Sequence, residues 1–187
     1  MSSIPKVVVL VGSLRKESLN RRLAAALPAL NAAPLEFEIA EIGTLALYNQ
    51  DLDGDSPPPA WAALRERVRA ADGVLFVTPE YNRSVPGVLK NAIDVASRPY
   101  GHNSFEGKPA AIISMSPGAV GGFGANHHLR QSLVFLNVPV MQQPEAYLGG
   151  AGSFFDADGK LNNDSTREFL TKFVRAFAKW IETNRQE

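Results

Sequence analysis

The segment from Gly12 to Asn20 carries the groups that proteins use to bind a phosphate. Gly12 permits a tight turn, while helix N-terminal amides, the hydroxyls of Ser13 and Ser18 and the Arg15 guanidinium are phosphate ligands. The segment therefore predicts a phosphate site, and a monoester would suit it. Its sequence matches neither the dinucleotide fingerprint G-x-G-x-x-G nor the P-loop. A serine-capped helix with a solvated arginine fits the same residues equally well.

A second segment, Thr78 to Gly87, contains two prolines, an asparagine and a glycine. These residues fix a turn, and its main-chain amides together with the Asn82 side chain suit the polar edge of a planar heterocycle. The Tyr81 ring is placed to cover a face of such a heterocycle. A proline-rich start of a helix, with Glu80 and Tyr81 on the surface, is the alternative, and spacing alone favours it slightly.

A third segment, Ser116 to Gly124, holds four glycines, so its main chain can approach a ligand closely. Its alternative is a flexible connector. Each of the three segments comes directly after an apolar run that is typical of a strand buried on both faces. This shared position is the reason to treat them as one site.

Hydrophobic patterns predict five strands that alternate with helices. The expected strands are Val7–Val11, residues 37–42 near the sheet edge, Gly73–Thr78, Ala110–Met115 and Val138–Met141. The expected helices contain the leucines 19, 23, 27 and 30; Trp61, Leu64 and Val68 after Ser56; Leu89, Ile93 and Val95; Leu129, Leu133 and Leu136; and, after a cap at Asp164 or Ser165, Phe169, Phe173, Phe177 and Ile181. Such alternation predicts an α/β fold with a parallel sheet covered on both faces. Ligands of these sheets bind outside the carboxyl ends of the strands, where the three segments lie.

Composition excludes several classes of protein. The 187 residues fit one domain, residues 1–187, and the 45% of hydrophobic residues exclude a disordered chain. Nineteen basic and nineteen acidic residues balance, so we expect no nucleic acid and no membrane surface as partner. The absence of cysteine excludes disulfides and thiolate chemistry. We see no secretory signal and no apolar run of the ~20 residues that a membrane span needs, and we expect a cytoplasmic protein.

We expect no metal site. His127 and His128 are adjacent, so they diverge on a helix and do not share an ion. The aspartates Asp51, Asp53 and Asp55 lack the glycine and glutamate of a calcium loop, and we interpret this run as a turn.

Two motifs found together in this order are specific: G-S-L-R-K-x-S-x-N at 12–20 and T-P-E-Y-N-x-S-x-P-G-x-L-K-N-A-I-D at 78–94. On these residues the chain resembles, over nearly its whole length, the NAD(P)H-dependent FMN reductases of flavodoxin-like fold, with their quinone, chromate and azo reductase relatives. The resemblance implies a three-layer sandwich with a five-stranded parallel sheet of order 2-1-3-4-5. It implies that Ser13, Arg15, Ser18, Leu19 and Asn20 hold the FMN phosphate, that Pro79, Glu80, Tyr81 and Asn82 hold the isoalloxazine, and that Ser116 and Gly118 lie on the other side of the ring.

Two positions depart from the family pattern. Arg83 stands where relatives commonly carry an aromatic residue, and Phe123 and Gly124 follow the glycine pair where relatives often carry an arginine. We expect Arg83 and Phe123 to contact the substrate.

By resemblance, the expected activity is hydride transfer from NADH or NADPH through bound FMN to a quinone, or to chromate, ferric chelates or azo compounds, in a ping-pong cycle. FMN carries the chemistry, so no catalytic side chain is expected. Apolar surface on the third and fourth helices, including Val88 and Phe135, predicts a homodimer or homotetramer. The competing class is a flavodoxin-type electron carrier without nicotinamide turnover, although such carriers are strongly acidic. A third class is a flavin-free interaction module of the same fold.

Overall fold

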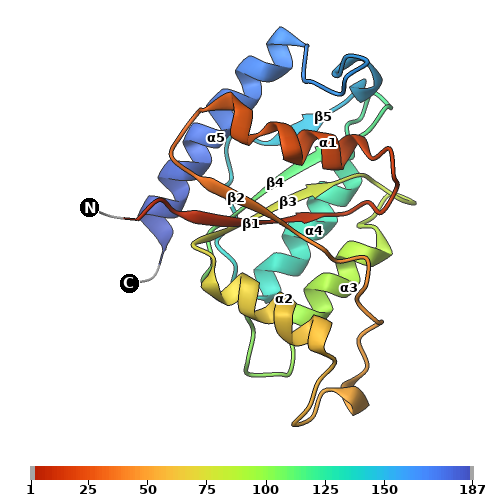
Figure 1. Cartoon of the computed structure of the whole chain (residues 1–187), viewed down its shortest axis with the longest axis vertical. Helices are drawn as coiled ribbons and strands as arrows, with labels where there is room; N and C mark the ends of the chain where they lie inside the picture. The colour runs from red at the N-terminus through yellow and green to blue at the C-terminus, as the bar shows by residue number, and fades with distance from the viewer. Residues whose placement is uncertain (1–2, 186–187) are drawn as a thin grey trace.

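The computed structural model describes residues 3–185, which form a five-stranded parallel sheet with helices on both faces (Figure 1). The strands are β1 (Lys6–Val11), β2 (Glu36–Ala40), β3 (Gly73–Thr78), β4 (Ala110–Met115) and β5 (Ala146–Leu148). The helices are α1 (Leu19–Ala26), α2 (Pro59–Ala70), α3 (Gly87–Ala96), α4 (Phe123–Phe135) and α5 (Asp164–Asn184). The strand order β2-β1-β3-β4-β5 confirms the predicted topology.

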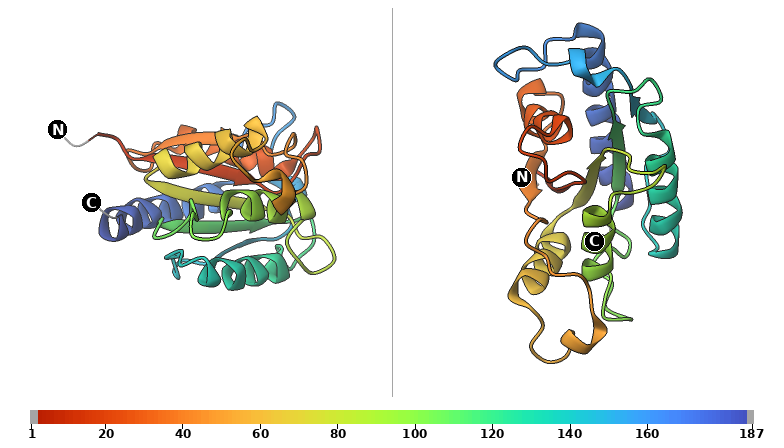
Figure 2. Two further views of the ribbon diagram at one scale, coloured as in Figure 1. Left: turned by 90° about the horizontal axis from the view of Figure 1, so that it is seen from below. Right: turned by 90° about the vertical axis from the view of Figure 1, so that its right-hand side faces the viewer.

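Two apolar layers, one on each face of the sheet, hold the helices in place. Successive strand residues point to opposite faces, so Val8 and Leu10 of β1 pack with α2, α3 and α4, whereas Val7 and Val9 pack with α1 and α5. All six residues of β3 and of β4 are buried, as expected of strands covered on both sides. Figure 2 shows the sheet between these two groups of helices.

The carboxyl ends of the inner strands lie side by side. Val11 of β1 is in register with Val77 of β3, and Thr78 is in register with Ser114 of β4. Because the chain passes from β1 to β2 on one side and returns to β3 on the other, the strand order reverses between β1 and β3. The loops after β1, β3 and β4 therefore leave the same edge of the sheet, on the right-hand side of Figure 1.

The predicted fifth strand, Val138–Met141, is wrong. Within this segment Val140 forms only an isolated bridge to Ala110, and the fifth strand is Ala146–Leu148, which pairs with Ile113–Met115. Pro139 has no N–H and cannot extend a ladder. The sequence signal for the true strand is weak because only three residues pair.

Helix ends also differ from expectation. The first helix ends at Ala26, before Pro28, and Leu30 lies in a separate 3-10 turn. Asn163, rather than Asp164 or Ser165, caps α5, since its side chain accepts a hydrogen bond from Thr166 N at 2.9 Å.

Within residues 3–185, no helix combines the length and the apolar character that a membrane crossing requires.

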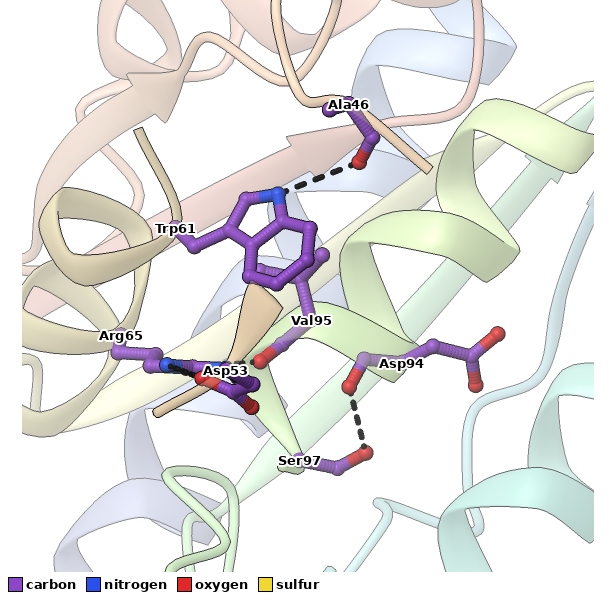
Figure 3. A network of polar contacts seen from close by, with 7 residues as sticks. All are labelled: Ala46, Asp53, Trp61, Arg65, Asp94, Val95 and Ser97. Carbon is purple, nitrogen blue, oxygen red and sulfur yellow. Dashed lines mark hydrogen bonds and ion pairs between the residues drawn. The ribbon is translucent and has the colours of Figure 1, made fainter. Parts of the chain in front are cut away.

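A buried ion pair anchors the long loop, residues 41–58, that connects β2 to α2 (Figure 3). Arg65 donates from both terminal nitrogens to the Asp53 carboxylate at 2.7 Å and from Nε to Val95 O at 2.9 Å. The side chains of Arg65 and Asp53 are 5% and 2% exposed. Trp61 Nε1 donates to Ala46 O. Asp53 ends the 3-10 turn Gln50–Leu52, which agrees with the predicted turn, and its carboxylate also belongs to the core.

Candidate functional site

The loop that follows β1 is closely packed at both of its ends. Gly12 N donates to Val77 O, and a Cβ on Gly12 would lie 2.6 Å from Thr78 Oγ1, so only glycine fits against the end of β3. At the other end, the Ser18 hydroxyl accepts from Arg21 N and caps α1. The serine cap that was the alternative interpretation is therefore present. It does not exclude the phosphate site, because the preceding residues remain exposed.

The same loop exposes one set of residues and buries another. Leu14 and Arg15 are exposed, whereas Ser13 and Asn20 are buried and Leu19 is half-buried. Among residues 3–185, no carboxylate pairs with Arg15. Asn20 Nδ2 donates to Met115 O at 3.3 Å, and its buried Oδ1 has no hydrogen-bond partner in the described chain. An unsatisfied buried acceptor is unfavourable, so the Asn20 Oδ1 needs a donor from outside the described chain.

The loop after β3 is a tight hairpin. Tyr81 and Ser84 exchange two main-chain hydrogen bonds, and Asn82 and Arg83 between them have φ of 51° and 63°. Positive φ at both central positions is the signature of a type I′ turn, which asparagine tolerates well. The turn predicted from the sequence is confirmed. Tyr81 is 51% exposed, which agrees both with contact to a ligand and with the surface position of the alternative interpretation.

The Glu80 side chain joins this hairpin to α4. Its Oε2 accepts from Ala125 N at 3.0 Å, and its Oε1 accepts from Arg83 at 3.2 Å. A Cβ on Gly124 would lie 2.8 Å from Glu80 Oε2 and 2.9 Å from Arg83 O. At the other end of the hairpin, Ser84 Oγ lies 2.9 Å from Nδ1 of His128. The loop expected at residues 116–124 is shorter in the structure, because Phe123 and Gly124 already belong to α4.

The loop after β4 is held by contacts with the segment that follows β5. The Gly118 carbonyl accepts from Ser116 Oγ, Gly121 N and Gly150 N, at 3.1, 3.4 and 3.2 Å. A Cβ on Gly149 would lie 2.2 Å from Ala119 O. These contacts contradict the alternative of a flexible connector. Gly149 and Gly150 were not expected at the site, because the strand before them was not predicted from the sequence.

A second group that the sequence analysis missed surrounds Phe123. Its ring centroid lies 4.2 Å from that of His127 and 5.2 Å from that of Tyr147, and His127 Nε2 lies 3.0 Å from the Tyr147 hydroxyl. Burial, together with a hydrogen bond to Glu145, raises the pKa of Tyr147 to about 12. Phe123 is thus part of a half-exposed aromatic cluster. Tyr147 lies in the strand that was not predicted, so no sequence signal pointed to it.

The structure brings all of the predicted site residues to one edge of the sheet. Those after β1 are Ser13, Arg15, Ser18, Leu19 and Asn20; those after β3 are Pro79, Glu80, Tyr81, Asn82 and Arg83; those after β4 are Ser116, Gly118 and Phe123. The Arg83 guanidinium is exposed and pairs with Glu80. Within the described part of the chain, histidine and carboxylate side chains form no group of three that suits a metal ion.

Comparison with known proteins adds an independent line of support. The family model described as NADPH-dependent FMN reductase matches residues 5–153. A quinone reductase from Pseudomonas putida is 61% identical over 185 residues, which is 99% of each chain. A 2-hydroxy-1,4-benzoquinone reductase from a Burkholderia species is 46% identical over 96% of this chain and 98% of its own.

Among solved structures, the flavoenzyme NAD(P)H:(acceptor) oxidoreductase FerB from Paracoccus denitrificans superimposes with a TM-score of 0.91. It is 45% identical, and the match covers 98% of this chain and 100% of that one. The sheet order, the three loops at one edge and these matches agree. The chain therefore belongs to the NADPH-dependent FMN reductase family.

Proposed function

We propose that this chain is an FMN-dependent NAD(P)H oxidoreductase, built as one domain, that reduces quinones. The observation that carries the proposal is the convergence of three features at the switch point of the sheet: the Arg15 guanidinium and the buried Asn20 Oδ1, neither of which has a partner among residues 3–185, and the Tyr81–Ser84 hairpin. The full-length similarity to quinone reductases supports the acceptor class. Chromate, ferric chelates and azo compounds are further acceptors of the same chemistry.

The residues after β1 fit the phosphate end of FMN. The Arg15 guanidinium has no carboxylate partner in residues 3–185 and is placed to form a charge-assisted bond with a phosphate. Ser13, Ser18, Leu19 and Asn20 complete this side. Because Asn20 Nδ2 is already bonded to Met115 O, its Oδ1 suits a hydroxyl donor, which the sugar-alcohol chain of FMN provides next to the phosphate.

The hairpin and the glycine loop fit the ring end of FMN. Pro79, Glu80, Tyr81 and Asn82 supply main-chain groups and one amide side chain to the polar edge of the ring, and Ser116 and Gly118 lie on its other side. When bound, FMN supplies the redox chemistry, taking hydride from NADH or NADPH and passing electrons to the acceptor. The contribution of the chain is to orient the ring and to aim fixed donors at the negative charge that the ring gains on reduction.

The substrate contacts come from the residues beyond the ring. Arg83 is exposed on the hairpin, and Phe123 is 47% exposed in its aromatic cluster with His127 and Tyr147. An aromatic surface of this kind suits a flat quinone. No side chain is required as a catalytic acid or base for hydride transfer.

A second copy of the chain is the proposed partner. On α4, Val134 and Phe135 are 76% and 74% exposed, while Val88 on α3 is half-buried against the core. Two large apolar side chains this exposed on one helix turn are unfavourable in water and favour a homodimer or homotetramer. We place the enzyme in the cytoplasm.

Anaerobic reduction tests the proposal. The purified protein is reconstituted with FMN, separated from free FMN and mixed with NADH or NADPH without oxygen. We expect bleaching of the flavin band and its return when a quinone is added. A yellow protein that neither nucleotide bleaches would be an electron carrier, and a protein that stays colourless with FMN would be a flavin-free module.

A further inference from the structure

The Tyr81–Ser84 hairpin depends on contacts outside itself. Arg83 adopts a left-handed conformation that is unfavourable for residues other than glycine, asparagine and aspartate. Asn82 also has a positive φ, so two of the four residues from Tyr81 to Ser84 do, and two main-chain hydrogen bonds close the turn. Such a turn keeps one geometry when the surrounding structure holds it.

Helix α4 holds the hairpin at two points. Glu80 Oε2 accepts from Ala125 N in the first turn of α4, and His128 one turn later lies within hydrogen-bond distance of Ser84 Oγ. The Glu80 contact is the stronger one, because a carboxylate bonded to a first-turn amide also interacts favourably with the helix dipole. The Glu80 side chain is 12% exposed, so solvent screens this contact little.

Gly124 makes the close approach possible. Its missing Cβ leaves room for both the Glu80 carboxylate and the carbonyl of Arg83, which would otherwise lie within 3 Å of it. A helix position normally favours alanine over glycine. Glycine at this position is thus explained by the approach of the hairpin rather than by the needs of the helix.

We propose that Glu80 is a positioning residue, whose carboxylate holds the Tyr81–Ser84 hairpin against the first turn of α4 and thereby sets the affinity and the reduction potential of the bound flavin. The inference rests on the proposed function, since the hairpin is the segment assigned to the ring. It gives the Glu80 side chain a role distinct from ring contact. Main-chain groups of residues 80–82 meet the ring, and the carboxylate fixes where they lie.

Three variants separate position from charge. Glu80→Ala removes the acceptor, Glu80→Gln keeps an oxygen that can accept from Ala125 N, and Gly124→Ala displaces the hairpin while leaving the carboxylate intact. Glu168→Ala is the matched control, because it removes an exposed carboxylate whose only ion pair within residues 3–185 is with Lys172 on α5. Amide hydrogen exchange is measured on the apoprotein, and FMN affinity and flavin midpoint potential are measured on the reconstituted protein.

In Glu80→Ala we expect faster amide exchange at Ala125, Tyr81 and Ser84. We also expect FMN binding to be about tenfold weaker, because one charge-assisted hydrogen bond is lost. The midpoint potential of the flavin also shifts in Glu80→Ala, because the hairpin that contacts the ring is no longer held in place. Glu80→Gln recovers most of the affinity. Gly124→Ala weakens FMN binding in the same direction although alanine stabilises the helix, and Glu168→Ala changes neither exchange at these amides nor FMN affinity.

Two results would overturn the inference: faster exchange in Glu80→Ala with unchanged FMN affinity and potential, or a Glu80→Gln variant as weak as Glu80→Ala. If Glu80→Ala does not fold, Glu80→Gln and Gly124→Ala decide the question by the same measures. Failure of the proposed function is distinguishable, because it appears in the wild-type protein as absent FMN binding or absent reduction by NADH and NADPH.

Discussion

The loops that follow the adjacent strands β1 and β2 start at the same edge of the sheet but differ in how their charges are used. Beyond β1, Arg15 is exposed and no carboxylate of residues 3–185 pairs with it. Beyond β2, Asp53 is buried and forms a bidentate pair with Arg65, whose third nitrogen bonds to Val95 O. Arg15 is thus available to a ligand, whereas Arg65 connects the loop after β2 to the rest of the fold.

This difference separates residues that bind from residues that stabilise. A buried charge is retained only when it is paired, so Arg65 belongs to the fold. The exposed Arg15, at the edge proposed to bind FMN, has no such stabilising role. Substitutions at the two arginines are therefore expected to affect different measurements.

The largest expected effect comes from Arg65→Met. The variant leaves the Asp53 carboxylate buried without its cation, and we expect a loss of about 3 to 5 kcal/mol in the free energy of unfolding. Urea unfolding measures the loss, and FMN affinity of the folded protein should remain near that of the wild type. The double variant with Asp53→Leu should recover part of the stability. A loss below about 1 kcal/mol would mean that the pair behaves like an exposed one.

Arg15→Ala should give the reverse pattern. We expect FMN binding to weaken by about 1.5 to 3 kcal/mol, since a charge-assisted phosphate contact is lost, while the melting temperature of the apoprotein stays unchanged. Riboflavin, which lacks the phosphate, is the control ligand and should bind both proteins equally. Equal FMN affinity of variant and wild type would place the phosphate elsewhere.

The sequence predicted the residues of the first loop but not the role of the Asp53 run. Gly12, Arg15 and Ser18 could be proposed as a phosphate site from the sequence, because such sites use few residue types close together in the chain. Asp53 and Arg65 are twelve positions apart in sequence, and nothing in their spacing shows that both side chains are buried. Burial of a polar pair is a tertiary property, so the aspartate was interpreted as part of a turn.

The same limit explains the error at β5. Three strands with continuous apolar runs were predicted correctly, because burial on both faces leaves a continuous pattern. The half-exposed edge strand was also predicted, but as residues 37–42, whereas it spans Glu36–Ala40. Ala146–Leu148 has three residues, and its partner Ile113–Met115 decides its conformation. Because this strand was not predicted, Tyr147 and the contact of Gly149 with Ala119 were not predicted either, although both lie beside predicted site residues.

Acid titration sharpens the assignment of Asp53 to the fold. Hydrogen bonds from Arg65 hold the pKa of Asp53 below its ordinary value, against the opposing effect of burial. A carboxylate with a depressed pKa in the folded state adds stability that is present above the unfolded pKa of about 3.9 and is lost as the pH falls through the folded value. The free energy of unfolding should therefore decrease below about pH 4, and less steeply in Asp53→Asn. An identical slope in the two proteins would contradict this contribution.

Tyr81→Ala tests the ligand side of the comparison at a second point. The ring is half-exposed on the hairpin, so we expect the free energy of unfolding to change by no more than about 0.5 kcal/mol. Turnover or the midpoint potential of the flavin should change instead. A lower melting temperature with unchanged turnover and potential would instead assign Tyr81 to the core.

Tyr147 combines features of both regions, because it is half-buried yet lies in the cluster with Phe123 and His127. Burial and then the hydrogen bond to Glu145 raise its pKa from 10.0 to about 12. The neutral phenol is therefore favoured in the folded state, and its contribution to stability is fully present below pH 10 and lost as the pH rises toward 12. Unfolding measured across this window should show a small alkaline decrease that Tyr147→Phe lacks. The decrease is the smallest of those expected, since solvent reaches part of the ring, and its persistence in Tyr147→Phe would assign it to another group.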